Sequence, residues 1–273
     1  MTQWASHIAR RIPGLFLTGS CLVGLSFAQP VRAANPDALW HIVHERCASQ
    51  DIAHGPGACA VLDSPHRVAV LKSIEGRSQY LLIPTDRNAG MESPALRDPA
   101  TPDYFAHAWA QAFRVGEGYG VRLPREDVAL AINSQDGRSQ NQFHIHVECI
   151  RPEIKVALYY MREAVSSQWA FLPALLRGHP YRAMRVNGTN LAGVKPFLRL
   201  AQSLRYPESE MGHHTLAVVP EIFDDNQPGF LILDGVADLA HKNRGSAEEL
   251  QDHSCAIVAL DPLVRPIGKP SSQ

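Results

Sequence analysis

The chain has 273 residues, of which 45% are hydrophobic and 19% charged, a composition typical of globular proteins rather than disordered or fibrous ones. Its formal net charge is -1 and its pI is near 6.9, so it lacks the overall positive field that non-specific nucleic-acid binding uses. We therefore expect no nucleic-acid partner, and any recognition of phosphate has to be local.

Residues 1–34 have the pattern of a targeting segment. Arg10 and Arg11 precede an apolar stretch over residues 15–28, and residues 31–33 end in the small-residue pattern at which a signal peptidase cuts. The alternative is an uncleaved membrane anchor, although the apolar run is shorter than the roughly 20 residues that span a bilayer. In both cases we expect the remainder of the chain to be exported from the cytoplasm.

Once Cys21 is set aside with this segment, an even number of cysteines remains: Cys47, Cys59, Cys149 and Cys255. In an oxidising compartment they suggest two disulfides, for which three pairings exist. Cys47 and Cys59 are the natural local pair, which would leave Cys149 to bond Cys255. Free buried thiols are the alternative, and no cysteine spacing resembles a zinc site.

The first half of the remaining chain is expected to mix strands with helices. We predict a helix over 36–48, an antiparallel meander of strands at 58–62, 68–72 and 80–84, and a long loop over 86–102. Asp103 is placed to cap a helix that runs to residue 116. A hairpin of strands 128–133 and 143–150 follows.

Later elements are less sharply marked. We expect helices at 154–165, 191–204 and 247–251, and a second hairpin that pairs 215–219 with 229–233. Ser246 and Glu249 have the spacing of a capping box for the last helix. Together these elements predict an α+β fold.

The strand over 143–150 carries the polar residues of most interest. Its alternation points Phe143, Ile145, Val147 and Cys149 into the core and Gln142, His144, His146 and Glu148 to the other face. One interpretation is that the two histidines are ordinary polar residues on a half-exposed strand. A second is a metal site, for which H-x-H supplies two ligands and His179, His213 or His214 would have to supply more.

A third interpretation is covalent catalysis. A neutral imidazole can attack an α-phosphorus, form a nucleotidyl-histidine and release it to water in a second step. The attack needs a group that orients the ring, donors for the phosphate oxygens and an acid for the leaving phosphate. Asn133, Ser139 and Gln140, which flank the strand, are candidates for these roles.

The stretch from Asn133 through Gln140 to His144-Ile145-His146 resembles the histidine-triad (HIT) superfamily, whose H-φ-H-φ-H-φ-φ motif follows Asn and Gln in a Gly-containing turn. The chain is also similar to the CDP-diacylglycerol pyrophosphatase family of bacterial membranes. The segments that carry this second resemblance are 79–85, 91–94, 101–105, 130–134, 144–152, 176–179 and 246–255. The four cysteines of that family are present too.

The resemblance implies an enzyme that hydrolyses CDP-diacylglycerol, or a related nucleotide diphosphate, to CMP and phosphatidate at the periplasmic face of the inner membrane. It implies a HIT-like antiparallel sheet with helices over residues 35–155, and no cofactor or metal. Residues 156–273 are expected to pack on this core, as a hypothesis in the form of a degenerate second HIT-like unit. The protein is then a monomer or a homodimer.

The triad is incomplete, and two frames fit it. If Gln142, His144 and His146 are the three positions, His144 is the nucleophile; if they are His144, His146 and Glu148, it is His146. The spacing from Asn133 favours the second frame, as do related branches with an H-x-H-x-Q motif, so we expect His146 to attack and His144 to orient it. Since an ionised Glu148 would repel phosphate, we expect it to be protonated, hydrogen-bonded or turned away.

Further candidates for contact with the substrate are Gln142, Lys72, Arg151, Arg177 and His179, each of which can also be an ordinary surface residue. The incomplete triad leaves a different class of function open as well. In that case the chain is a non-catalytic nucleotide- or lipid-binding protein on the same scaffold.

Overall fold

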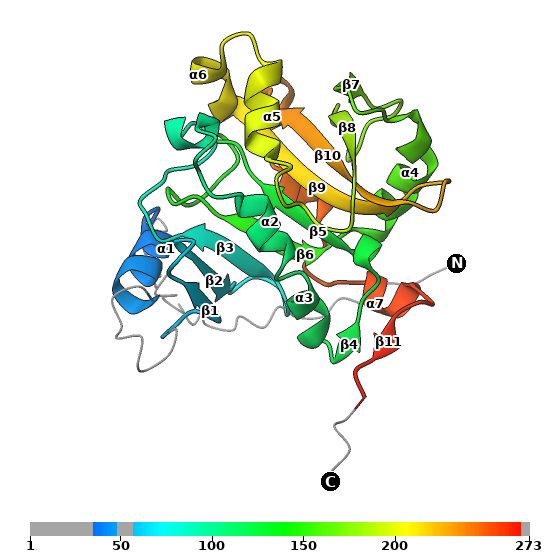
Figure 1. The fold of residues 1–273 in the computed structure, drawn as a ribbon, viewed down its shortest axis with the longest axis horizontal. Helices are drawn as coiled ribbons and strands as arrows, with labels where there is room; N and C mark the ends of the chain where they lie inside the picture. Colours follow the sequence, from blue (N-terminus) through cyan, green and yellow to red (C-terminus); the bar gives the residue numbers. More distant parts are fainter. Residues whose placement is uncertain (1–34, 48–56, 269–273) are drawn as a thin grey trace, which may run out of the picture. The chain divides into compact units, whose positions relative to one another are not determined.

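The computed structural model describes residues 35–47 and 57–268, so the predicted targeting segment lies outside the described residues. Within these ranges no helix has both the length and the apolar character needed to cross a bilayer. The same ranges contain a nine-stranded antiparallel sheet with the order β1-β2-β3-β6-β5-β9-β10-β8-β7 (Figure 1). The predicted α+β class is confirmed.

The first part of the chain builds one side of the sheet. Its elements are α1 (Ala38–His41) with a further helical turn (Ile42–Cys47), β1 (Val61–Asp63), β2 (Val68–Lys72), β3 (Tyr80–Pro84), α2 (Tyr104–Trp109), α3 (Phe113–Glu117), β4 (Val121–Arg122), β5 (Val128–Ile132) and β6 (Ile145–Cys149). The meander and the β5–β6 hairpin are as predicted. The single helix predicted over 103–116 is instead two helices, and the Asp103 carboxylate accepts a hydrogen bond from Lys195 N (3.2 Å) rather than capping α2.

The second part builds the other side. Its elements are α4 (Pro152–Met161), β7 (Ala170–Phe171), β8 (Arg182–Asn187), α5 (Pro196–Ser203), α6 (Pro207–Glu210), β9 (His214–Ile222), β10 (Pro228–Val236), α7 (Ile257–Leu260) and β11 (Arg265–Pro266), which pairs with β4. Short 3-10 turns occur at Pro94–Arg97, Arg125–Asp127, Arg162–Ala164, Met211–His213, Leu239–His241 and Ala247–Leu250. The second predicted hairpin is confirmed as β9–β10.

The predicted capping box at residue 246 is wrong. Ser246 Oγ donates to Asn133 Oδ1 (3.0 Å), and the Glu249 carboxylate binds His179 and Tyr181. Both side chains are used in contacts between distant segments, so residues 247–250 form a 3-10 turn without a side-chain cap.

The two sides of the sheet repeat one arrangement. In each, a hairpin is followed by a helical segment and a second hairpin, and the strands lie in the order β2-β3-β6-β5 or β7-β8-β10-β9. The inner strands β5 and β9 join the two sides as an antiparallel pair in which Ala131 lies opposite Ala217.

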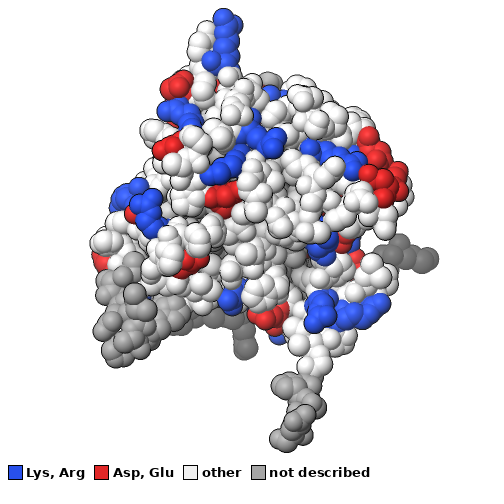
Figure 2. Space-filling view, in the orientation of Figure 1, with Lys and Arg blue, Asp and Glu red and all other residues white. Residues whose placement is uncertain are grey.

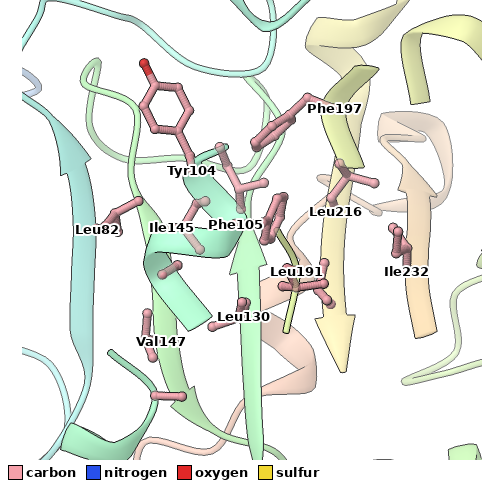
Figure 3. Close-up of a cluster of buried hydrophobic side chains, with 14 of the residues drawn as sticks. Leu82, Tyr104, Phe105, Leu130, Ile145, Val147, Leu191, Phe197, Leu216 and Ile232 are labelled. Atoms are coloured by element: carbon pink, nitrogen blue, oxygen red, sulfur yellow. The ribbon is translucent and has the colours of Figure 1, made fainter. Parts of the chain in front are cut away.

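Two layers of apolar side chains cover the two faces of the sheet. On one face, Phe105 of α2 and Phe197 of α5 pack over Leu130, Ile145 and Leu216 (Figure 3), and both helices lie in front of the sheet in Figure 1. On the other face, Ile154 and Leu158 of α4 belong to one apolar cluster with Leu231 and Leu233 of β10.

The strand β6 takes part in only one of these layers. Ile145 and Val147 point into the layer under α2, so His146 and Glu148 point to the opposite face. The polar face predicted from the alternation is therefore present, and it lies beside the small side chains of Ala129 and Ala131.

Candidate active site

The two histidines of the strand lie side by side and are buried. His144 directly precedes β6 and is 7% exposed, and His146 within β6 is 6% exposed. Their ring centroids are 4.8 Å apart, with an interplanar angle of 66°. The interpretation of this pair as ordinary surface residues is therefore wrong.

His144 has a fixed tautomer. Its Nδ1 lies 2.7 Å from the carbonyl oxygen of Gln142, which can only accept a hydrogen bond, so Nδ1 carries a proton. Burial, and after it the neighbouring His146 ring, lowers the pKa of His144 to about 4. The ring is therefore neutral near pH 7, with an unshared electron pair on Nε2.

His146 faces a carboxylate that the sequence did not point to. Its Nδ1 lies 3.1 Å from Glu248 Oε1, although the atoms are not aligned as a hydrogen bond. Burial holds the pKa of His146 below its usual range, with Glu248 opposing and His253 adding to the shift. The two histidines thus differ in their Nδ1 partner, which is a carbonyl for His144 and a carboxylate for His146.

Glu248 is held by two amides. Asn133 Nδ2 donates to its Oε2 (3.1 Å) and Gln79 Nε2 donates to its Oε1 (3.1 Å), while Asn133 Oδ1 accepts from Glu248 N (3.2 Å). Burial acts to raise the pKa of Glu248, but His146 and the two amides together hold it below its usual range. The carboxylate is therefore ionised beside the His146 ring.

Glu148 occupies the end of the site away from His144. Its Oε2 accepts from Gln79 Nε2 (2.8 Å) and pairs with His253 Nδ1 (2.8 Å), so the side chain is hydrogen-bonded, as expected. Burial raises the pKa of Glu148 against the opposing effects of His253 and Gln79. His253 Nε2 lies 3.9 Å from Glu248 Oε1, and the His253 side chain is 46% exposed.

Residues 246–255, which we call the closing segment, bring Glu248 and His253 to β6. The segment is tied there by the Cys149–Cys255 disulfide, by Asp252 N donating to Cys149 O (2.9 Å) and by Gln251 Nε2 donating to His146 O (3.2 Å). The other predicted disulfide, Cys47–Cys59, is also present.

Arg138 is the cation on the His144 side of the site. It forms two hydrogen bonds of 2.6 Å to Glu92, and it lies close enough to disfavour protonation of His144. A small cavity is lined by both Arg138 and His144, together with Asn133, Gln142, Gly90 and other residues.

Of the predicted site residues before the strand, two use their side chains in other hydrogen bonds and a third is exposed. Gln142 Nε2 donates to the carbonyls of Pro84 (3.0 Å) and Asp86 (2.9 Å). The Gln140 side chain binds Asn35 O and Leu39 N, far from the histidines in sequence. Ser139 is exposed in the turn. Of the flanking residues, the structure brings only Asn133 to the Glu248–His146 pair.

The basic residues predicted to contact the substrate lie in two separate places. Lys72 Nζ donates to the carbonyls of Ser73 (2.7 Å) and Gly76 (3.1 Å), and burial lowers its pKa against the opposing effect of Glu148. The other three lie around Glu249 or α4 instead: Arg151 Nε donates to Glu249 O, His179 pairs with the Glu249 carboxylate, and Arg177 pairs with Glu153.

The residues suggested as further metal ligands do not gather at the strand. His213 pairs with Asp136 (2.8 Å) and His214 with Asp234 (2.6 Å). Among the described residues, a group whose possible ligand atoms lie within 4.8 Å of one another is Asp63, His66 and His107, on β1, the following turn and α2.

The residues that the sequence did not single out are Gln79, Arg138, Glu248, Gln251 and His253. One signal for the last three was available, because the predicted Cys149–Cys255 bond places the residues before Cys255 next to β6. On the face seen in Figure 2, basic and acidic side chains are interspersed around a broad uncharged area, which fits the near-zero net charge.

Comparison with known proteins adds a family to this geometry. A family model described as CDP-diacylglycerol pyrophosphatase matches residues 34–259. A curated protein of Yersinia pestis described as a CDP-diacylglycerol pyrophosphatase is 40% identical over 234 residues, which cover 85% of this chain and 89% of that relative. The range matched by the family model includes both β6 and the closing segment.

Proposed function

The chain belongs to the CDP-diacylglycerol pyrophosphatase family, and we propose that it hydrolyses its substrate through a nucleotidyl-histidine intermediate on His144. The reaction is hydrolysis of the diphosphate of CDP-diacylglycerol, with CMP and phosphatidate as products. The resemblance to this family is confirmed by both comparisons. The wider relation to HIT proteins remains a prediction.

One observation carries the choice of nucleophile, and it is the hydrogen bond from His144 Nδ1 to Gln142 O. This bond commits Nδ1 to donation and leaves Nε2 free to attack, and the lowered pKa of about 4 keeps the ring unprotonated. At His146 burial also lowers the pKa, but the carboxylate beside Nδ1 opposes this effect and favours a proton on the ring, whereas the partner of His144 Nδ1 is a carbonyl oxygen. The geometry thus supports the first frame, although the spacing in the sequence favoured His146.

The reaction then has two displacement steps. His144 Nε2 attacks the phosphorus that bears cytidine, the bond from that phosphorus to the bridging oxygen breaks, and a proton from His146 goes to the departing phosphatidate. Water then attacks the nucleotidyl-histidine and releases a proton to solvent, CMP leaves as the N–P bond breaks, and His146 takes up a new proton from solvent before the next turnover. Arg138, which pairs with Glu92 and lines the same small cavity as His144, is the cation that we propose to stabilise charge on the phosphate oxygens.

The setting of the reaction follows from the substrate and the cysteines. We propose that the enzyme works outside the cytoplasm, at the periplasmic face of the inner membrane where its lipid substrate lies. Two disulfides support an oxidising compartment. We also propose that residues 156–273 are a degenerate second HIT-like unit, supported by the repeated strand order. Such a chain contains both units within one monomer.

The test uses CDP-diacylglycerol labelled on the phosphorus next to cytidine. His144→Ala should reduce CMP release by on the order of 10³-fold or more and leave no labelled protein. His146→Ala should still accumulate a labelled adduct, slowly, because its nucleophile is intact. The matched control is His214→Gln, a buried histidine of the second half that pairs with Asp234, which should keep near wild-type turnover. Full activity of His144→Ala would show that the nucleophile is elsewhere.

The same assay separates the alternatives from the proposal. Loss of activity in a chelator, without a labelled adduct in the untreated enzyme, would favour a metal-dependent hydrolase that uses the H-x-H strand as ligands. Binding of CDP-diacylglycerol without any turnover would favour a non-catalytic lipid- or nucleotide-binding protein. We expect neither outcome, and we expect the chelator to leave turnover unchanged.

A further inference from the structure

The closing segment contributes an acidic and a basic side chain to a site whose nucleophile lies more than a hundred residues earlier in the chain. We propose that Glu248 is a positioning residue that holds His146 as the proton donor to the departing phosphatidate, and that His253 connects this pair with solvent. The proposal rests on the proposed function, and it assigns a role that the H-x-H strand alone does not supply.

The geometry gives Glu248 one orientation. Its two carboxylate oxygens are each bound by an amide, Oε2 by Asn133 and Oε1 by Gln79, and Oε1 also lies 3.1 Å from His146 Nδ1. A carboxylate held in this way fixes the ring it faces and stabilises the imidazolium form. Nδ1 of His146 faces Glu248, and Nε2, which is buried without a hydrogen-bond partner among the described residues, is the atom we assign to donate a proton to the substrate.

The backbone around His146 is held by the same segment. Gln251 Nε2 donates to the carbonyls of His146 (3.2 Å) and Ala129 (2.7 Å), which joins β5, β6 and the closing segment. The closing segment therefore fixes both the side chain and the main chain of His146. Glu249, the next residue after Glu248, instead binds His179 and Tyr181.

A proton used in each turnover has to reach a buried ring. His146 is 6% exposed, whereas the His253 side chain is 46% exposed and its Nε2 lies 3.9 Å from Glu248 Oε1. Its other nitrogen, Nδ1, lies 2.8 Å from Glu148 Oε2, and this contact orients the His253 ring. The order solvent, His253, Glu248, His146 is a path along which a proton can be restored.

Other charged or titratable groups lie near this path among the described residues, and one of them is Tyr119, whose hydroxyl donates to Ser254 O (3.4 Å) and whose pKa is raised by burial and then by Glu148. His144 adjoins His146 on the same strand, Glu148 adjoins His253, and Lys72 on β2 lies behind Glu148. Arg138 lies beyond His144. Of these groups, Glu248 is the one that favours a proton on His146, and His253 opposes it.

The test compares two leaving groups in single-turnover experiments. Phosphatidate needs a proton as it departs, whereas the dinitrophenolate of a CMP 2,4-dinitrophenyl ester departs as a stable anion. Glu248→Gln should slow release of phosphatidate about 10²-fold and leave release of dinitrophenolate close to the wild-type rate. In this variant the basic limb of the kcat/KM profile should move to lower pH. The reason is that the neutral glutamine side chain does not stabilise the imidazolium form of His146 as the carboxylate does. Glu249→Gln is the matched control and should change neither rate.

Each part of the proposal has its own contrary result. Equal slowing of both substrates by Glu248→Gln would show a purely structural role, and an unchanged rate with CDP-diacylglycerol would show no role at all. His253→Gln should lower steady-state turnover, and added imidazole should restore it; without such rescue the proton takes another route. If wild-type enzyme forms no adduct, the proposed nucleophile fails, yet the contrast between leaving groups still reports on Glu248.

Discussion

The two halves of the sheet are arranged alike but differ in the side chains on one face. The first half consists of β2, β3, β6 and β5, and the second half of β7, β8, β10 and β9. On β6 this face bears His146 and Glu148, and on the corresponding strand β10 it bears Leu231 and Leu233. The opposite face is apolar on both strands, with Ile145 on one and Ile232 on the other. The two halves therefore share the sheet arrangement, and we propose that the chemistry resides on one face of one strand.

The side chains that cover this face also differ between the two halves of the sheet. In the second half it consists of apolar side chains of α4, such as Ile154 and Leu158. In the first half it is the closing segment, which places Glu248 and His253 over the histidine strand and Leu250 over the apolar side. The chain that leaves the second half thus completes the site of the first, and we infer one catalytic site per chain.

The largest expected effect comes from separating the closing segment from β6. The Cys149–Cys255 bond joins residues 106 apart, for which the chain-entropy model gives about 4.7 kcal/mol of stabilisation. The double variant Cys149→Ser, Cys255→Ser should lose about that much unfolding free energy in denaturant titrations. It should also lose most of its kcat/KM for CDP-diacylglycerol, because Glu248 and His253 are no longer tied beside His146.

The matched variant is Cys47→Ser, Cys59→Ser. This bond joins residues 12 apart and is worth about 3 kcal/mol in the same model. It lies beside β2 and β3 in a separate apolar cluster, so the folded double variant should keep its kcat/KM. Equal kinetic losses in the two double variants would contradict a specific role for the closing segment.

An intermediate effect is expected from Leu233→Ala in the second half. Leu233 is fully buried against α4 and the neighbouring strands, and truncation of such a side chain costs about 2–5 kcal/mol of unfolding free energy. The kcat/KM of the folded variant should stay near wild type, because the second half supplies packing at this position. A large kinetic loss without loss of stability would mean that the second half takes part in catalysis.

Much of the fold could be predicted from local patterns. Period-two alternation located β2, β3 and both hairpins, and the even cysteine count with one short spacing led to the correct disulfides. The same alternation placed His144 and His146 on one face. These features depend on neighbours in sequence, so a single chain reveals them.

The parts of the fold and of the candidate site that the sequence did not predict depend on contacts between distant segments. Asn133 and Glu248 are 115 residues apart, and no local pattern distinguishes Glu248 from Glu249, although only Glu248 faces His146. Ser246 has the spacing of a helix cap but bonds Asn133 instead. The choice of frame also needed coordinates, because the Nδ1 partner of each histidine is set by the fold and not by spacing.

The smallest effect concerns pH, and it contrasts one buried group in each half. Burial lowers the pKa of His144 from 6.5 to about 4 and raises the pKa of Glu221 on β9 from 4.5 to about 7. Between pH 4 and pH 6.5 the unfolded chain binds the extra proton at His144, so this group makes stability rise with pH. Between pH 4.5 and pH 7 the folded chain holds the proton at Glu221, so this group makes stability fall with pH.

In the wild type the two slopes oppose each other wherever their ranges overlap, and single variants should reveal them. His144→Gln should gain stability at about pH 5 relative to about pH 6.5, and Glu221→Gln should show the reverse, each by up to about 1.4 kcal/mol per pH unit. Denaturant titrations at both pH values measure these differences in unfolding free energy. The contributions of other titratable groups cancel in the comparison with wild type, because all variants share those groups. If His144→Gln instead gained stability at about pH 6.5 relative to about pH 5, His144 would be protonated in the folded chain near pH 5. The ring would then not be the neutral nucleophile that its bond to Gln142 O favours.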